Sequence, residues 1–291
     1  MGFLKNLFGI GKAESDEEKT QAEEARNFDI LKYDGVKALK SHQYDYAVKC
    51  LCHALEIKED LETTDYLSQA YVMTGQLTLA YDMLQKLADA QPDNQQIFIR
   101  MANIAYMLED YHAMTSACEK ALVLDNSNPI VNYLYAQACL GEHDSANAIA
   151  LLTKALSLDN NFADALLIRG ETLLKNGNIE DAENDADSLL QQVPDNEDVL
   201  MLKARIEKAK DDKTTAIIYY NKVIDANPFR AEAYNERGQL RMANGDNAGK
   251  EDIAYAAELQ QQQAQQGDKG EDIEQNVKEN YKNADPYGIF G

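Results

Sequence analysis

The sequence contains no tryptophan, and it has only 5 proline and 4 cysteine residues in a chain of 291. It also lacks any apolar run of the roughly 18 residues that a membrane-spanning helix requires. We therefore do not expect a transmembrane segment. Scarce proline together with abundant Ala, Leu, Glu, Gln and Lys is typical of a helical protein. These absences favour an all-α chain.

Positive charge is in short supply as well. The chain has 28 Lys and Arg against 50 Asp and Glu, a formal net charge of -22. Because nucleic-acid binding rests on Lys and Arg contacts to phosphates, this balance argues against nucleic acid as a partner. A partner with a basic segment is easier to accept, although the same charge can simply be a solvated surface.

Reactive side chains show no arrangement typical of a catalytic or metal site. The motifs HExxH, GxGxxG, GxSxG and the P-loop are all absent, and the cysteines have no CxxC spacing. We therefore expect no enzyme activity, no metal and no cofactor. Cys118 and Cys139 fall at inward helix positions, which predicts reduced packing residues of a cytoplasmic protein.

What the sequence does have is a period. The segment 121–125, Ala-Leu-Val-Leu-Asp, returns 34 residues later as Ala-Leu-Ser-Leu-Asp at 155–159. The same step predicts seven repeats: 28–60, 61–94, 95–128, 129–162, 163–196, 197–230 and 231–264. Two helical patterns per repeat, helix A and helix B, bury their apolar sides only against neighbouring repeats, so the pattern predicts an α-solenoid.

Small residues mark where the two helices of a repeat approach each other. Position 8 holds Gly35, Ser68, Ala102, Ala136, Gly170, Ala204 and Gly238, and position 20 holds Ala47, Ala80, Ala148, Ala182 and Ala216. Met114 and Lys250 are the exceptions at position 20. Because Lys250 replaces the small residue, we expect the last helix B to be a polar cap.

Several positions together resemble the tetratricopeptide repeat family. Besides the small residues, they are an aromatic at 17 (Tyr44, Tyr111), Lys-Ala-Leu at 26–28 (120–122, 154–156) and proline at 32 (Pro92, Pro194, Pro228). The resemblance implies a right-handed superhelix whose concave face binds a protein or peptide. Residues 1–27 would then be an arm and lead-in, and 265–291 a flexible tail.

The resemblance also implies which residues line the concave face. Helix A contributes positions 2, 5, 9, 12 and 13, so the predicted peptide groove comprises Gln69, Val72, Met73, Ile99, Asn103, Tyr106, Met107, Ile130, Tyr133, Gln137 and Leu140. Gln69, Asn103 and Gln137 form a row of carboxamides, which both donate and accept hydrogen bonds. The alternative is that several of these side chains pack against neighbouring helices.

Two further features bear on the partner. Toward the C-terminus the groove is expected to become acidic, with Asp164, Glu171, Asp198, Glu232 and Glu236. This gradient fits a partner whose apolar segment is followed by a basic one. The family's carboxylate clamp for chaperone C-termini is absent, because the corresponding residues are Lys32, Val36, Tyr66, Gln96 and Arg100 and only the first and last agree.

The N-terminal arm is a second candidate site. Phe3, Leu4, Leu7, Phe8 and Ile10 gather on one side of a helical wheel. Such a segment can lie on a membrane surface or in a partner's groove, or it can pack against the first repeat. The sequence thus predicts a non-catalytic, cytoplasmic interaction scaffold, with a membrane-surface adaptor anchored by residues 1–12 as the alternative. It leaves the oligomeric state and any role of the C-terminal motif 285–291 open.

Overall fold

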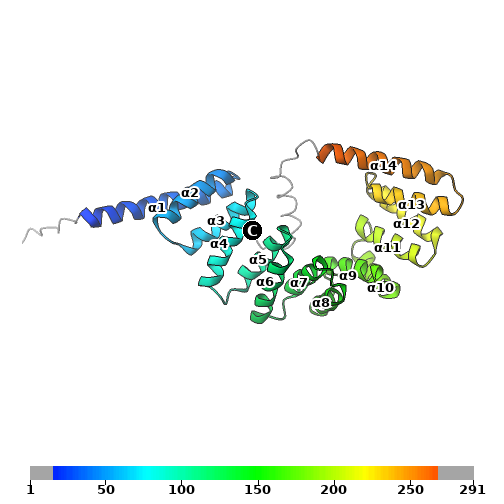
Figure 1. The fold of residues 1–291 in the computed structure, drawn as a ribbon, viewed down its shortest axis with the longest axis horizontal. Coiled ribbons are helices and arrows are strands. Elements are labelled where there is room, and N and C mark those ends of the chain that lie inside the picture. Colours follow the sequence, from blue (N-terminus) through cyan, green and yellow to red (C-terminus); the bar gives the residue numbers. More distant parts are fainter. Residues whose placement is uncertain (1–15, 268–291) are drawn as a thin grey trace, which may run out of the picture. The chain divides into compact units, whose positions relative to one another are not determined.

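The computed structural model describes residues 16–267, and this part of the chain consists of helices without a strand (Figure 1). The helices are α1 (Asp16–Lys40), α2 (Tyr44–Ile57), α3 (Leu61–Met73), α4 (Leu77–Ala90), α5 (Gln95–Met107), α6 (Tyr111–Leu124), α7 (Pro129–Gly141), α8 (Ser145–Leu158), α9 (Ala163–Lys175), α10 (Ile179–Gln192), α11 (Glu197–Ala209), α12 (Lys213–Ala226), α13 (Ala231–Ala243) and α14 (Ala248–Gly267). The expected all-α repeat fold is confirmed. Among residues 16–267, none of the helices combines the length and the hydropathy that a membrane span requires.

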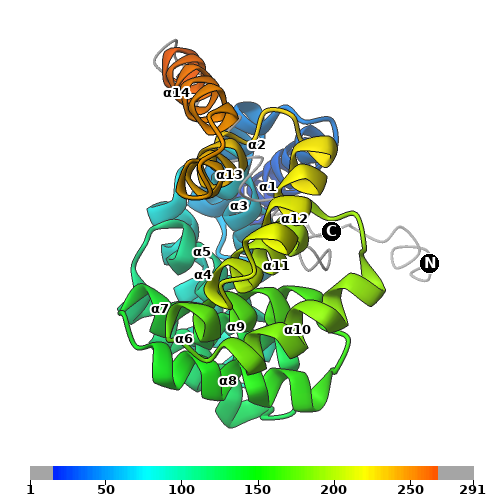
Figure 2. The ribbon, with the colours of Figure 1, turned by 90° about the vertical axis from the view of Figure 1, so that its right-hand side faces the viewer.

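The chain divides after Pro92 into two compact units. Among the described helices, the first unit holds α1 to α4 and the second α5 to α14. Within each unit every helix packs against the next in sequence. The helices of the second unit accordingly follow one another in chain order (Figure 2).

The 34-residue period sets where helix A begins. From the second repeat on, helix A starts at residues 61, 95, 129, 163, 197 and 231, a constant step of 34, and each of these helices has 13 residues. The first helix differs. α1 begins at Asp16, twelve residues before the predicted repeat start at Phe28, so the acidic stretch before the first repeat extends its helix A.

Every repeat turns from helix A to helix B through a left-handed residue at position 15. Gly75, Gly177 and Gly245 have positive φ, and so do the non-glycine residues His42, Glu109, His143 and Asp211. The next residue donates its amide to the carbonyl five positions back, as in Asp144 to Cys139 at 2.7 Å. This closure satisfies carbonyls at the end of helix A. The turn therefore forms even where no glycine is present.

Small residues lie where the sequence places them in all but the last repeat. The alanines at position 20 are fully buried. In the last repeat, however, α14 begins 35 residues after α12 instead of 34, and Gly249 faces Gly238. A Cβ on Gly238 would lie 2.8 Å from the Gly249 carbonyl oxygen. The expectation that Lys250 takes the place of the small residue is thus wrong, because the contact with helix A falls one repeat position earlier, at the buried Gly249, and Lys250 is exposed.

Candidate binding surface

The predicted groove residues of the second unit lie on two helices in contact with each other, α5 and α7. Accessible side chains on these helices are Tyr106 and Met107 on α5, and Ile130, Tyr133, Gln137 and Leu140 on α7. We call these six residues the helix-A surface. Tyr106 is the most open, at 41% exposed. Ile99 and Asn103 from the same predicted set are buried instead.

Gln69, Val72 and Met73 belong to α3 in the first unit. Val72 is buried, whereas Gln69 and Met73 are half-buried. Their continuity with the helix-A surface stays a prediction.

The carboxamides of Gln69, Asn103 and Gln137 form the same kind of hydrogen bond within their helices. Gln69 Nε2 donates to Asp65 Oδ2 at 3.2 Å, Asn103 Nδ2 to the Ile99 carbonyl at 3.1 Å, and Gln137 Nε2 to the Tyr133 hydroxyl at 3.3 Å. Each acceptor is four residues back on the same helix. A carboxamide has two N–H groups and an acceptor oxygen, so one N–H is engaged in each. Because Asn103 is only 4% exposed, Gln69 and Gln137 are the accessible members of the row.

Tyr133 is held in place by its neighbour in the next loop. Its ring centroid lies 4.9 Å from that of the buried Phe162, with the planes tilted by 40°. An aromatic pair of this kind orients the ring as well as burying area. The partly accessible Tyr133 is therefore a rigid part of the helix-A surface.

The expected acidic gradient is only partly present. Burial raises the pKa of Asp164 and Glu171 on α9, although Glu171 remains exposed. Both side chains follow the helix-A surface along the repeat order, at positions 2 and 9. A carboxylate that loses hydration in this way gains from a nearby cation.

The other three carboxylates, Asp198, Glu232 and Glu236, form ion pairs with arginines of the same chain. Arg230 Nη1 lies 2.6 Å from Asp198 and Arg230 also contacts Glu232, and Arg205 Nη2 lies 2.8 Å from Glu236. Burial by itself would raise the pKa of Glu236, but hydrogen bonds from Arg205 and Tyr220 lower it. Sequence reasoning missed these pairs because the partners lie in different repeats or on different helices.

A polar ladder links successive repeats of the second unit. Position 7 of one repeat bonds position 25 of the preceding repeat, always 16 residues away: Tyr135 with Glu119 at 3.1 Å, Arg169 with Thr153 at 3.1 Å, Lys203 with Asp187 at 2.7 Å, and Arg237 with Asn221 at 2.7 Å. Sequence reasoning missed this ladder as well. Its signal was the recurrence of long polar side chains at position 7.

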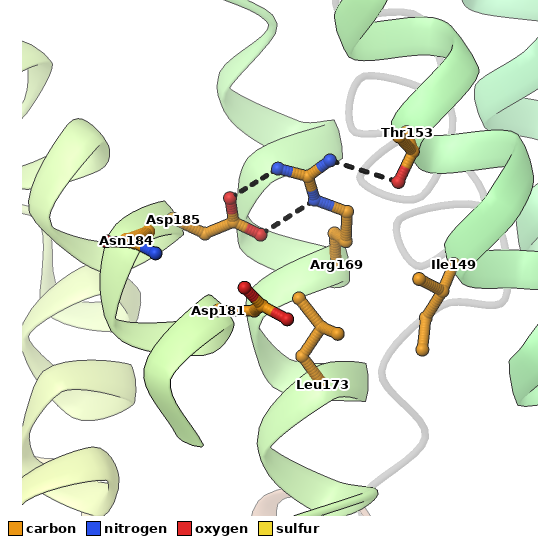
Figure 3. A pocket seen from close by; sticks show the side chains of 7 residues that line it. All are labelled: Ile149, Thr153, Arg169, Leu173, Asp181, Asn184 and Asp185. Atoms are coloured by element: carbon orange, nitrogen blue, oxygen red, sulfur yellow. Dashed lines mark hydrogen bonds and ion pairs between the residues drawn. The ribbon is translucent and has the colours of Figure 1, made fainter. Parts of the chain in front are cut away.

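A cavity of about 300 Å³ lies beside one rung of this ladder (Figure 3). Its lining is Ile149 and Thr153 from α8, Arg169 and Leu173 from α9, and Asp181, Asn184 and Asp185 from α10. Arg169 donates to both Asp185 oxygens, at 2.8 and 2.6 Å, and to Thr153 (Figure 3). The bidentate pair joins helices A and B of one repeat, and the Arg169–Thr153 bond joins that repeat to the preceding one, so we assign the cavity wall a structural role.

Other reactive groups offer no obvious chemistry. Within residues 16–267 no group of three or more His, Cys, Asp or Glu side chains is placed to hold a metal ion. Cys118 and Cys139 are buried, and burial raises the pKa of both thiols. Thiols of this kind are poor nucleophiles. The N-terminal arm residues Phe3 to Ile10 and the motif 285–291 lie outside the described residues.

Comparison with known proteins is consistent with this geometry. Family models described as tetratricopeptide repeat match residues 140–206 and 197–230. The mouse DnaJ homolog subfamily C member 3 is 27% identical over 165 residues, covering 49% of this chain and 31% of the mouse protein. This chain therefore spans about a third of that relative.

Solved structures show the same fold. A tetratricopeptide repeat protein from Parabacteroides merdae superposes with a TM-score of 0.66 and 14% identity, over 89% of this chain and 99% of that one. YrrB, a TPR protein described as having an unusual peptide-binding site, gives a TM-score of 0.52 and 15% identity, over 67% of this chain and 97% of its own. At such identities the likeness establishes the fold alone.

Proposed function

Since the chain is a tetratricopeptide repeat protein, we propose that it is a non-catalytic interaction scaffold that binds a segment of another protein on the helix-A surface. The observation that carries this proposal is the accessible aromatic and aliphatic cluster on α5 and α7, built around Tyr106, Tyr133 and Leu140. Aromatic and methionine side chains of this kind are enriched at binding hot spots. Gln137 adds a carboxamide that can bond a partner's backbone.

The partner's chemistry follows from the order of residues along the repeats. An apolar or aromatic stretch would contact α5 and α7, and a Lys or Arg next along the partner would reach Asp164 and Glu171 on α9. Burial raises the pKa of both carboxylates and outweighs the lowering by Arg205 and Arg230 at Glu171, which supports a further cationic contact at the exposed Glu171. Asp198, Glu232 and Glu236 contribute little, because Arg205, Lys208 and Arg230 already neutralise them.

A scaffold of this kind needs no catalytic group, and we place the protein in the cytoplasm. The membrane-adaptor alternative rests on residues 1–12, which lie outside the described residues, and stays a prediction.

The test is affinity purification of the tagged full chain from its native host, followed by mass spectrometry. We would compare the parent with a Tyr106→Ser, Gln137→Ser, Glu171→Gln variant, which changes accessible side chains. The matched control is Val123→Ser with Phe229→Ser, two highly exposed apolar residues away from the helix-A surface. Far-ultraviolet circular dichroism checks that all three chains keep their helices.

The proposal expects at least one protein that the parent and the control both retain and the surface variant loses. If all three chains co-purify with the same proteins, the helix-A surface is not the binding site. Loss of Glu171 alone should weaken binding mainly at low ionic strength, because salt screens an accessible ion pair.

A further inference from the structure

The first repeat leaves open a helix face that later repeats bury. Helices α3, α7, α9, α11 and α13 each pack on the preceding helix. In all five, repeat positions 3 and 10 are buried, and positions 6 and 7 are buried or half-buried. In α1, position 3 is Ile30, which is 48% exposed, position 6 is Tyr33, which is 67% exposed, and position 10 is the exposed Lys37.

Helix α2 adds to this open face. Tyr46 is an exposed aromatic, and it lies close enough to Cys50 for a hydrogen bond and to Asp34 for charge interaction, both of which raise the pKa of its phenol. Asp34 occupies position 7 of α1. We group Ile30, Tyr33 and Asp34 of α1 with Tyr46 of α2, the helix packed against α1, and call this group the end face. A stacked repeat array leaves such a face at each end, and an uncovered apolar end promotes association.

We infer that the N-terminal arm, residues 3–10, docks on the end face and takes the place of a preceding helix B. Its five large apolar side chains, Phe3, Leu4, Leu7, Phe8 and Ile10, lie on one side of a helical wheel. A helix with such a stripe buries it against another apolar surface. The end face offers the matching apolar side chains within the same chain.

The arm is long enough to reach. From Asp16 to Tyr33 the helix rises about 26 Å at 1.5 Å per residue. Residues 11–15, if extended, span about 17 Å, and residues 3–10, as a helix, add about 12 Å. The sum of about 29 Å is an upper limit, because residues 11–15 must also reverse the direction of the chain. Ile30 lies about 21 Å from Asp16 along α1, so the folded-back arm can lay its apolar side over Ile30 and extend toward Tyr33.

Charge favours this direction of folding. Residues 1–13 carry Lys5 and Lys12 and no acidic side chain, whereas residues 16–27 carry five acidic and two basic side chains. An arm that lies back along α1 brings its lysines beside these carboxylates and beside Asp34. The same carboxylates would repel an anionic membrane, which makes the end face the better site for the arm.

The absence of tryptophan from the sequence provides the test. Tyr33→Trp in the full chain places a single tryptophan on the end face. If the arm docks, the emission of this introduced tryptophan is blue-shifted and poorly quenched by acrylamide. Removing residues 1–12, or introducing Leu7→Glu with Phe8→Glu in the intact chain, should shift the emission to the red and increase quenching.

Phe229→Trp is the matched control, because Phe229 is 66% exposed and belongs to the second unit. Its emission should not respond to either arm variant. Equal emission and quenching of the end-face tryptophan with and without the arm would overturn the inference. So would a blue shift that grows with protein concentration, which would indicate a second copy on the end face. A blue shift seen only after adding phosphatidylserine vesicles would assign the arm to the membrane instead and equally overturn it.

Discussion

Replacing Lys203 by methionine tests whether the polar ladder stabilises the stack of repeats. The Lys203 ammonium lies 2.7 Å from both Glu183 and Asp187 on α10, and 3.4 Å from Glu207 on its own helix. Its side chain is only 7% exposed. Burial by itself would lower the pKa of Lys203, but the hydrogen bonds to Asp187 and Glu183 outweigh burial and raise it. The folded chain therefore favours the charged form.

The magnitude follows from what the substitution leaves behind. Breaking a buried ion pair by removing one partner typically costs about 3–5 kcal/mol, because the remaining charge is uncompensated. Here Lys210 still contacts Glu183 at 2.9 Å and Glu207 at 3.3 Å, and Asp187 is half exposed and can regain water. We therefore expect Lys203→Met to cost about 2–3 kcal/mol, below the range for a fully buried pair.

Lys213→Met is the matched control. Lys213 is 38% exposed, and its contact with the open Asp211 is 3.7 Å long. Exposed pairs contribute about 0–1 kcal/mol, so this variant should resemble the parent. The measurement is native-state hydrogen exchange of the α10 and α11 amides, with the α3 amides as an internal reference, because repeat arrays unfold locally. If the two variants lie within about 0.5 kcal/mol of each other, the ladder does not stabilise the stack.

The pH dependence gives an independent check. The pKa of Lys203 is raised, so its contribution is complete below about pH 10 and declines as pH rises through the folded-state value. The pKa of Glu183 is lowered by Lys203 and Lys210, so its contribution is complete above about pH 5 and declines as pH falls. The difference between the parent and Lys203→Met should therefore be constant between about pH 5 and 10.

Two further predictions concern other parts of the chain. Gly249→Ala should lower the free energy of unfolding by several kcal/mol in a thermal or urea melt, because the added Cβ would press on the Gly238 carbonyl and lie 2.9 Å from the Met242 amide nitrogen. Lys250→Ala, the control, should change stability little. If Lys250→Ala is the more destabilising of the two, Lys250 and not Gly249 makes the close contact with helix A. Burial alone would raise the pKa of Asp60, but hydrogen bonds from Lys32 and Thr63 bring it to about 2. A carboxyl group whose pKa is lower in the folded chain stabilises the fold at pH values above its unfolded-state pKa, and this stabilisation is lost as pH falls. Asp60→Asn should therefore lower the free energy of unfolding by about 2 kcal/mol at pH 7, and the difference should vanish toward about pH 2. Glu59→Gln, at an exposed neighbour, serves as its control, and a pH-independent difference for Asp60→Asn would contradict the assignment.

The repeat architecture could be predicted closely because its causes are local. Helix A begins at the same repeat position because its apolar stripe recurs, even in α9 and α13, whose N-cap residues Phe162 and Arg230 make no side-chain cap. The small residues at positions 8 and 20 mark the contacts between helices. The glycines predict the left-handed turn at Gly75, Gly177 and Gly245, but no such signal marks His42, Glu109, His143 and Asp211. There the helix-ending hydrogen bonds impose the conformation on residues that do not favour it.

The binding surface was less predictable, because exposure depends on which neighbours cover a side chain. Asn103 and Gln137 occupy equivalent repeat positions, yet the first is buried and the second accessible. Glu171 and Glu236 are both carboxylates of the expected acidic region, yet only Glu236 is paired with Arg205 and Lys208.

The sequence by itself determined the all-α repeat fold and the 34-residue step, since these follow from periodicity within about two helical turns. Only the tertiary structure decided the division after Pro92, the one-residue shift that brings Gly249 against Gly238, the ladder through Lys203 and the open end face at Tyr33. Each of these features depends on contacts between helices. A long side chain can reach several possible partners or none, and the repeat period of the sequence does not specify which contact forms.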